Sequence, residues 1–134
     1  LEKLGFLGGS TNVSEGALNA VDPVRQGKQG IEDSVQKFYD QTMKGGHNKG
    51  TPELVKYLTS HSMDEVNWLE GLGVKFKGEI GTATGALWQR SHYPATPSGN
   101  TYIRTFEDVI NLSSRPLVMS TVYSRREPRA LSAA

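Results

Sequence analysis

The sequence predicts a helix-rich α/β fold with few strands and no internal repeat. Apolar residues recur at helical spacing in four segments, whereas only two segments have the pattern of a β-strand. The chain has 134 residues, of which 36% are hydrophobic and 22% are charged. This length and this composition are typical of one soluble globular domain.

The N-terminal part of the chain is predicted to be a long loop. Residues 8–30 are polar and contain several glycines, and the short apolar run at 17–21 leaves room for one helical turn. Long loops inside compact domains usually have a function. This segment is therefore a candidate for binding residues.

The first predicted helix spans residues 31–43. Ile31, Val35 and Phe38 are spaced at i, i+4 and i+7, which places them on one apolar stripe. The glycines at positions 45–46 are expected to end the helix.

Two further helices are predicted between residues 52 and 73. The first covers residues 52–60, with Thr51 as its N-cap and Pro52 at its first helical position. Its inward face is expected to hold Leu54, Val55 and Leu58. The second begins with a capping box at residues 62–65 and ends near the glycines at 71–73.

The C-terminal half alternates between strand and helix signals. Residues 74–80 predict a strand or hairpin arm, and residues 81–100 predict a loop. A fourth helix is predicted at 101–112, and residues 116–123 (PLVMSTVY) have the strongest strand signal in the chain. Residues 125–134 are predicted to be unstructured.

Two strands form only a marginal sheet unless other elements cover them. We therefore expect a protein partner, or further copies of the chain, to cover the apolar faces that remain exposed. These faces are the stripe of Ile31, Val35 and Phe38 and the strand residues Leu117, Met119 and Thr121.

Composition argues against several classes of protein. The formal net charge of +1 is too small to predict nucleic-acid binding. The chain has no cysteine, and its three histidines do not have the spacing of a zinc motif, so no metal site is predicted. No segment is apolar enough for a transmembrane helix, and no secretory signal is visible. We expect a soluble protein of the cytoplasm or the mitochondrion rather than a secreted one.

Glu2 and the glycines that follow it are typical of a nucleotide-binding loop. An acidic residue in this position accepts hydrogen bonds from ribose hydroxyls, although an ordinary surface glutamate is the alternative. Gly8, Gly9 and Gly16 allow the backbone to approach a flat ring or a phosphate closely. Short polar side chains lie beside them, and a generic polar turn remains the alternative interpretation. These side chains are Ser10, Thr11, Ser14 and Asn19.

Arg90 and His92 form the other candidate group. An arginine and a histidine close together in a loop suit a carboxylate or a phosphate. The alternative is structural, with the pair tying the loop to neighbouring carbonyl groups. The sequence contains no GxSxG motif, P-loop or paired-carboxylate site, so no catalytic residue is assigned.

Four segments of the chain carry a family resemblance in their order and spacing. They read EKLGFLGGSTNVSEGALNA, QGIEDSVQKFYDQTMKGG, PELVKYLTSHSMDEVNWLEGLGV and RSHYP. These segments resemble consecutive blocks of the soluble fumarate reductase and flavocytochrome c flavoproteins. That family consists of FAD-dependent oxidoreductases related to succinate dehydrogenase flavoproteins. The likeness extends to the following helix and strand and ends near Tyr123.

The resemblance implies a set of FAD-binding residues. Glu2 would bind the adenosine ribose, with Lys3 beside it. The GGST turn would match the family's GGNT turn near the flavin, and Gly16 would match the AxGGxNA segment beside the isoalloxazine. RSHYP would match the RSHRP loop close to the cofactor pocket. The residues implied in cofactor binding are Glu2, Lys3, Gly8, Gly9, Ser10, Thr11, Ser14, Gly16, Arg90, Ser91 and His92.

The resemblance also implies a fold and a function. Residues 1–124 would form a partial FAD-binding, Rossmann-like domain with a helical insertion, followed by a tail at 125–134 that does not match. The chain would be a segment of a fumarate reductase-like oxidoreductase, in which reduced flavin acts on the C=C bond of a dicarboxylate such as fumarate. The alternative is a degenerate, inactive remnant that serves as a structural or interaction subunit of a larger assembly.

Several positions depart from the family pattern. The substituted positions are Ser10 for Asn, Ala17 for Gly, Gln41 for Asp and Tyr93 for Arg. Glu15 stands where a small residue is usual, and its carboxylate would oppose a reduced, anionic flavin unless it points away. The GxGxxG phosphate turn and the family's catalytic residues are not among these 134 residues.

Overall fold

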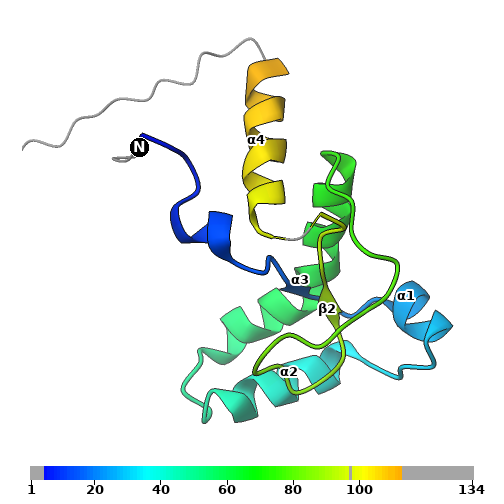
Figure 1. Ribbon diagram of the computed structural model, residues 1–134. Helices are drawn as coiled ribbons and strands as arrows, with labels where there is room; N and C mark the ends of the chain where they lie inside the picture. Colours follow the sequence, from blue (N-terminus) through cyan, green and yellow to red (C-terminus); the bar gives the residue numbers. More distant parts are fainter. Residues whose placement is uncertain (1–4, 97, 113–134) are drawn as a thin grey trace, which may run out of the picture.

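The computed structural model describes residues 5–96 and 98–112 (Figure 1). In chain order the elements are η1 (Gly9–Val13, a 3-10 helix), β1 (Leu18–Asn19), α1 (Pro23–Lys28), α2 (Val35–Gly45), α3 (Pro52–Gly71), β2 (Ser91–His92) and α4 (Asn100–Leu112). Within the described residues, helices dominate and the single sheet has two short strands. This confirms the predicted helix-rich fold with few strands.

The predicted loop of residues 8–30 contains more regular structure than expected. Besides η1 and β1 it includes α1, which has a strong N-terminal signal. The Asp22 carboxylate accepts hydrogen bonds from the backbone amides of Val24 and Arg25, both at 2.9 Å. Pro23 occupies the first helical position, where no backbone donor is needed.

Helix α2 begins later than its apolar spacing predicts. The Ser34 hydroxyl accepts a hydrogen bond from the Lys37 amide and caps the helix, so α2 starts at Val35 rather than Ile31. The predicted apolar stripe is therefore wrong in part, because Ile31 precedes the helix and Val35 is exposed. Phe38 alone of the three is buried.

Helix α3 is one continuous helix where the sequence predicts two. The predicted capping box at 62–65 lies in its interior, and no glycine or proline interrupts residues 53–70. The Ser62 hydroxyl, the expected cap, donates instead to the Thr59 carbonyl at 3.4 Å, and the nearby Ser60 hydroxyl donates to the Lys56 carbonyl at 2.7 Å. Such bonds tend to bend helices, and Figure 1 shows α3 changing direction between its teal first half and its green second half.

The buried side of α3 also differs from the prediction. Leu54 and Leu58 were expected to face inward, but they are 69% and 54% exposed. The buried positions follow a neighbouring stripe and are Thr59, Ser62, Val66 and Leu69. The packing of the second half of the helix therefore sets its orientation.

Residues 74–95 form a partly paired, irregular ladder. The predicted strand at 74–80 is reduced to isolated antiparallel bridges, which pair Phe76 with Pro94 and Gly81 with Ser91. Strand β2 lies inside the segment predicted as loop, and it pairs antiparallel with β1. In this register Leu18 is opposite His92 and Asn19 is opposite Ser91.

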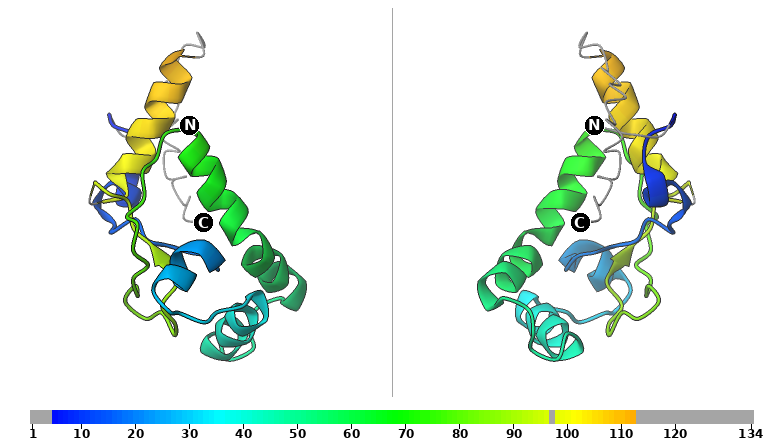
Figure 2. Two further views of the ribbon diagram at one scale, coloured as in Figure 1. Left: turned by 90° about the vertical axis from the view of Figure 1, so that its right-hand side faces the viewer. Right: turned by 90° about the vertical axis from the view of Figure 1, so that its left-hand side faces the viewer.

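Helix α4 matches its prediction to within one residue and contributes to the core. The core centres on Leu69, Val74 and Tyr102. Partly buried apolar residues pack around it, namely Leu18, Phe76 and Phe106. Figure 2 shows α4 and the second half of α3 inclined to each other on either side of this region.

Several predictions fall outside the described residues. These are the strand at 116–123, the boundary and tail at 125–134, and the FAD-binding roles of Glu2 and Lys3. They stay predictions.

Candidate cofactor site

The glycine-rich loop of residues 8–16 depends on glycine at defined points. Gly8, Gly9 and Gly16 all have positive φ angles, of 94°, 45° and 73°. Other residues rarely adopt this backbone conformation. A Cβ on Gly8 would lie 2.6 Å from Cγ1 of Ile103, whereas a Cβ on Gly9 would meet no atom within 4 Å. The loop is therefore packed against α4 at Gly8 and open at Gly9.

The N-terminal end of α4 holds this loop in place. The Gly99 amide donates to the Ser14 carbonyl at 2.9 Å, and the Tyr102 hydroxyl donates to the Gly16 carbonyl at 2.5 Å. The contact is so close that a Cβ on Gly99 would lie 2.2 Å from the Thr11 carbonyl oxygen. Burial raises the pKa of Tyr102 to about 12, with a further contribution from Glu65, so this hydroxyl keeps its proton at physiological pH.

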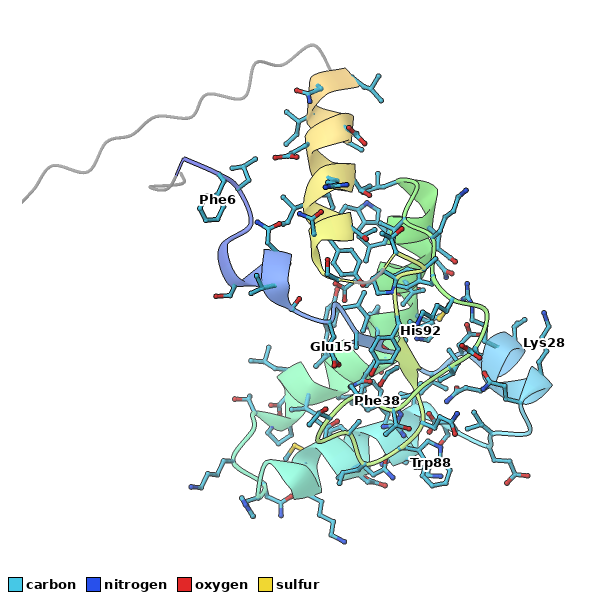
Figure 3. The ribbon with its side chains drawn as sticks, in the orientation of Figure 1. Phe6, Glu15, Lys28, Phe38, Trp88 and His92 are labelled. Atoms are coloured by element: carbon cyan, nitrogen blue, oxygen red, sulfur yellow. The ribbon has the colours of Figure 1, made fainter. Side chains whose placement is uncertain are left out.

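The polar side chains of the loop face solvent. Ser10, Thr11 and Ser14 are exposed, and the Ser14 hydroxyl donates to the Thr11 carbonyl at 2.9 Å. Glu15 is exposed too, and Figure 3 shows it on the loop between η1 and the sheet. A shallow groove of about 350 Å³ is lined by Ser14 and Glu15 and, across from them, by Lys77 and Tyr93.

Arg90 lies in the interior and is bonded to its own chain. Its Nε and Nη2 donate to the two carboxylate oxygens of Asp33, at 2.9 and 2.8 Å, and both side chains are almost fully buried. Nη2 also donates to Oε1 of Gln41 at 2.8 Å, and the guanidinium lies 4.3 Å from the centre of the Phe38 ring. Arg90 therefore joins β2 to α2 and to the segment before it.

Gln41 is one of the departures from the family pattern, and the structure gives it a consequence. Its amide oxygen accepts from Arg90, but it is neutral, so Asp33 is the carboxylate that balances the buried guanidinium. A buried charge of this kind is tolerated only when it is paired and hydrogen-bonded.

Ser91 and His92 are also buried, and each has a partner in the chain. The Ser91 hydroxyl donates to Oδ1 of Asn19 at 2.6 Å and accepts from the Ala83 amide at 2.9 Å. Nε2 of His92 lies 3.2 Å from Oδ2 of Asp22. Nδ1 of His92 is buried and has no hydrogen-bond partner among the described residues.

Asp22 is the centre of a second buried charge cluster. Burial acts to raise its pKa, but hydrogen bonds from the backbone and side chain of Arg25 and from His92 outweigh burial and lower the pKa to about 2. Arg25 bonds Asp22 at 2.8 Å and also pairs with Glu70 at the end of α3. The cluster joins α1, α3 and β2.

The structure brings the two predicted groups, the glycine loop and the Arg90–His92 segment, into one region. The side chains of the loop are exposed, whereas those of Arg90 and His92 are buried. The glycine loop leads into β1, β1 pairs with β2, and the Arg90–His92 segment is therefore adjacent to the loop. Arg90 and His92 do not bond to each other; each binds a different aspartate.

The sequence alone does not indicate a role for Asp22 or Asp33. The Asp22–Pro23 pair has the local signal of a helix N-terminus, so this aspartate could have been found. Asp33 has no such signal, because its partner Arg90 is 57 residues away along the chain. Among the described residues no cluster of three His, Asp or Glu side chains is arranged to hold a metal ion. Likewise, none of the helices in the described ranges has the length and hydrophobicity needed to cross a bilayer.

The glycine loop is open on one side, whereas the Arg90–His92 segment is not. The open space at Gly9 leaves room for a flat ring or a phosphate to approach the backbone. The side chains of Ser10 and Thr11 beside it are exposed to solvent. By contrast, the side chains of Arg90 and His92 are buried and bonded within the chain, which suits a position behind the loop rather than direct contact with a ligand.

Comparison with protein families and curated proteins yields consistent matches. The FAD binding domain family matches residues 1–129. The chain is 36% identical over 99 residues to a fumarate reductase (cytochrome) of Shewanella frigidimarina. The aligned residues cover 74% of this chain and 17% of that protein. The chain is also 34% identical over 94 residues to an NADH:fumarate oxidoreductase of Klebsiella pneumoniae. Here the aligned residues cover 70% of this chain and 10% of the relative.

A solved structure agrees with these relatives. The open conformation of a flavocytochrome c3 fumarate reductase superposes with a TM-score of 0.76 at 34% identity. The superposition covers 85% of this chain and 20% of the other. The chain thus spans a fifth or less of the length of these relatives.

Proposed function

Because the chain belongs to the FAD binding domain family, we propose that it is a segment of an FAD-dependent, fumarate reductase-like oxidoreductase and that it holds part of the flavin. The observation that carries this proposal is the glycine loop. It combines left-handed glycines, exposed hydroxyls and a rigid attachment to α4. FAD, when bound, supplies the reducing electrons for the C=C bond of a dicarboxylate such as fumarate.

We assign the chain's own residues to binding the flavin cofactor rather than to catalysis. Gly8, Gly9 and Gly16 let the backbone approach the cofactor, and Ser10, Thr11 and Ser14 offer hydrogen bonds. Glu2 and Lys3 are assigned to the ribose side. The segment Arg90–His92 is assigned a positioning role without direct contact with the cofactor. Its bonds to the rest of the chain hold β2 in place, and β2 in turn holds β1 beside the glycine loop. The proposed boundaries remain 1–124 for the FAD-binding segment and 125–134 for the tail.

A structural or interaction subunit is the second candidate, and one observation favours it. Each side chain of the Arg90–His92 segment bonds to another part of the chain, Arg90 to Asp33, Ser91 to Asn19 and His92 to Asp22. Such a network stabilises a fold whether or not a cofactor binds. In this case the chain would bind a protein partner and no flavin.

Flavin binding separates the two candidates. FAD is titrated into the full chain, and bound flavin is measured by equilibrium dialysis and by its fluorescence. We expect saturable binding that Ser10→Arg weakens by about tenfold, or ~1.4 kcal/mol, because the long side chain blocks the open face of the loop. Asn67→Arg is the matched control, since it adds the same group at an exposed position of α3.

The outcome also decides how the chain works with other segments. If FAD binds neither to the chain alone nor after addition of the rest of a Shewanella frigidimarina relative, the flavin proposal is wrong and the structural subunit stands. Recovery of fumarate reduction in the mixture would support a segment of the enzyme directly.

A further inference from the structure

A pocket of about 250 Å³ lies beside α2, apart from the glycine loop. Its walls come from α2, from β1 and from the segment that precedes β2. Two of its residues, Phe38 and Trp88, are labelled in Figure 3 next to α2. None of the described residues that line it belongs to the loop of residues 8–16, so the pocket is separate from the proposed flavin contacts.

Arg90 brings unused hydrogen-bond donors to this pocket. Its Nε and Nη2 bond Asp33 and Gln41, whereas Nη1 has no partner among the described residues. Because Asp33 occupies one edge of the planar guanidinium, Nη1 lies on the edge next to Gln41. Arg90 and Gln41 both line the pocket, although Arg90 is only 3% exposed. An acceptor that enters the pocket can therefore reach a buried positive charge.

Two side-chain amides add donors of the same kind. The amide oxygen of Gln41 accepts from Arg90 and that of Asn19 accepts from Ser91, so the amide nitrogens are left to bond. Neither nitrogen has a partner in the part of the chain that the structure describes. The indole N–H of Trp88 is also buried without an acceptor there. No aspartate or glutamate is among the described residues that line the pocket, so its unpaired groups favour an anion.

The other walls of the pocket are apolar. Phe38, Leu87 and Trp88 line it, and the Arg90 guanidinium lies 4.3 Å from the centre of the Phe38 ring. Apolar walls with a few convergent polar groups are typical of sites for small molecules. The donors select a carboxylate, and the aromatic walls select a flat apolar group attached to it.

We propose that this pocket binds a small carboxylate with a flat apolar body, such as an aromatic acid. The carboxylate oxygens accept from Nη1 of Arg90 and from the side-chain amides of Gln41 and Asn19, and the body lies against Leu87 and Trp88. Gln41 determines this specificity. An aspartate, the usual residue of the family at this position, would repel the ligand. The site is thus a property of this chain rather than of the family.

An NMR titration of the full chain with benzoate tests the site. The sample contains no flavin, so the result does not depend on the proposed function. We expect saturable shifts of the side-chain N–H signals of Asn19, Gln41 and Trp88. Benzamide has the same shape without the charge and should bind at least about tenfold more weakly.

Gln41→Glu is the decisive variant, because it replaces only the amide nitrogen by a negatively charged oxygen. It should weaken benzoate binding by about tenfold or more. The fold should persist, since the new carboxylate gives the buried guanidinium a second ionic partner. Gln36→Glu makes the same exchange at an exposed position of α2 outside the pocket and should leave the affinity unchanged.

Four results would overturn the proposal. Benzoate would fail to saturate the chain by about 20 mM, or its shifts would fall on residues outside the pocket. Benzamide would bind as tightly as benzoate, or Gln41→Glu would bind benzoate as tightly as the natural chain.

Discussion

At the scale of single residues, Arg90 links three parts of the chain that are far apart in sequence. Its guanidinium bonds Asp33 and Gln41 and stacks over Phe38, while its backbone carbonyl accepts from the Ala20 amide. The charge is almost fully buried, so the energy of the site depends on the balance between desolvation and pairing.

Asp33→Ala should therefore be severely destabilising. It leaves the Arg90 guanidinium buried without its carboxylate, for which we expect a loss of about 3–5 kcal/mol in the free energy of unfolding. Urea denaturation followed by circular dichroism measures this loss. Asp64→Ala, at an exposed position of α3, should change stability by less than about 0.5 kcal/mol. Similar small effects for both variants would mean that the ion pair contributes little.

Asp22 predicts a dependence of stability on acid. Because its pKa in the folded chain is about 2, below the ordinary value of 3.8, the stability it contributes is present above about pH 4–5. This contribution, roughly 2 kcal/mol, is lost as the pH falls from there toward 2. Urea denaturation between pH 6 and pH 2.5 should show a smaller fall for Asp22→Asn than for the natural chain. Parallel curves for the two proteins would contradict this assignment.

At the scale of elements, α3 illustrates how a local signal can be overridden. Ser62 and Glu65 have the spacing of a capping box, yet the backbone continues through them as helix. Because Ser60 and Ser62 bond to carbonyls of the preceding turn, their hydroxyls do not need a helix end.

His61→Pro distinguishes one helix from two. In the interior of a continuous helix, proline removes a backbone hydrogen bond and clashes with the preceding turn, which costs about 3 kcal/mol or more. His61→Ala is the control, because it removes the same ring and its stacking on Tyr57 but keeps the backbone donor. The prediction fails if thermal unfolding gives the same midpoint for both variants, as it would at a break between two helices.

The contact between the glycine loop and α4 gives a second prediction at this scale. Gly99→Ala places a methyl group 2.2 Å from the Thr11 carbonyl oxygen, so the loop must move away from the helix. We expect a loss of about 1–3 kcal/mol in stability. Gly27→Ala in α1 meets no atom within 4 Å and should be neutral or stabilising by about 0.5–1 kcal/mol. Chemical denaturation of the two proteins measures the difference, and a neutral Gly99→Ala would contradict the close contact.

At the scale of the whole molecule, the sequence predicts what depends on local pattern and misses what depends on distant partners. The end of α2 at its glycines, the Thr51–Pro52 start of α3 and nearly all of α4 follow from local residue types. The inward face of α3 does not, because the packing of its second half around Leu69 decides which side is buried. The same holds for the candidate site, where the glycines are recognisable but Asp22 and Asp33 are found only through the residues they meet.

The pairing of Asp33 with Arg90 has a consequence for how such chains diverge. Losing either partner leaves an unbalanced buried charge, whereas replacing both by apolar residues of similar volume costs far less. Natural selection should therefore rarely accept a change at one position without a compensating change at the other. In a collection of related genes, positions 33 and 90 are expected to vary together, although 57 residues separate them.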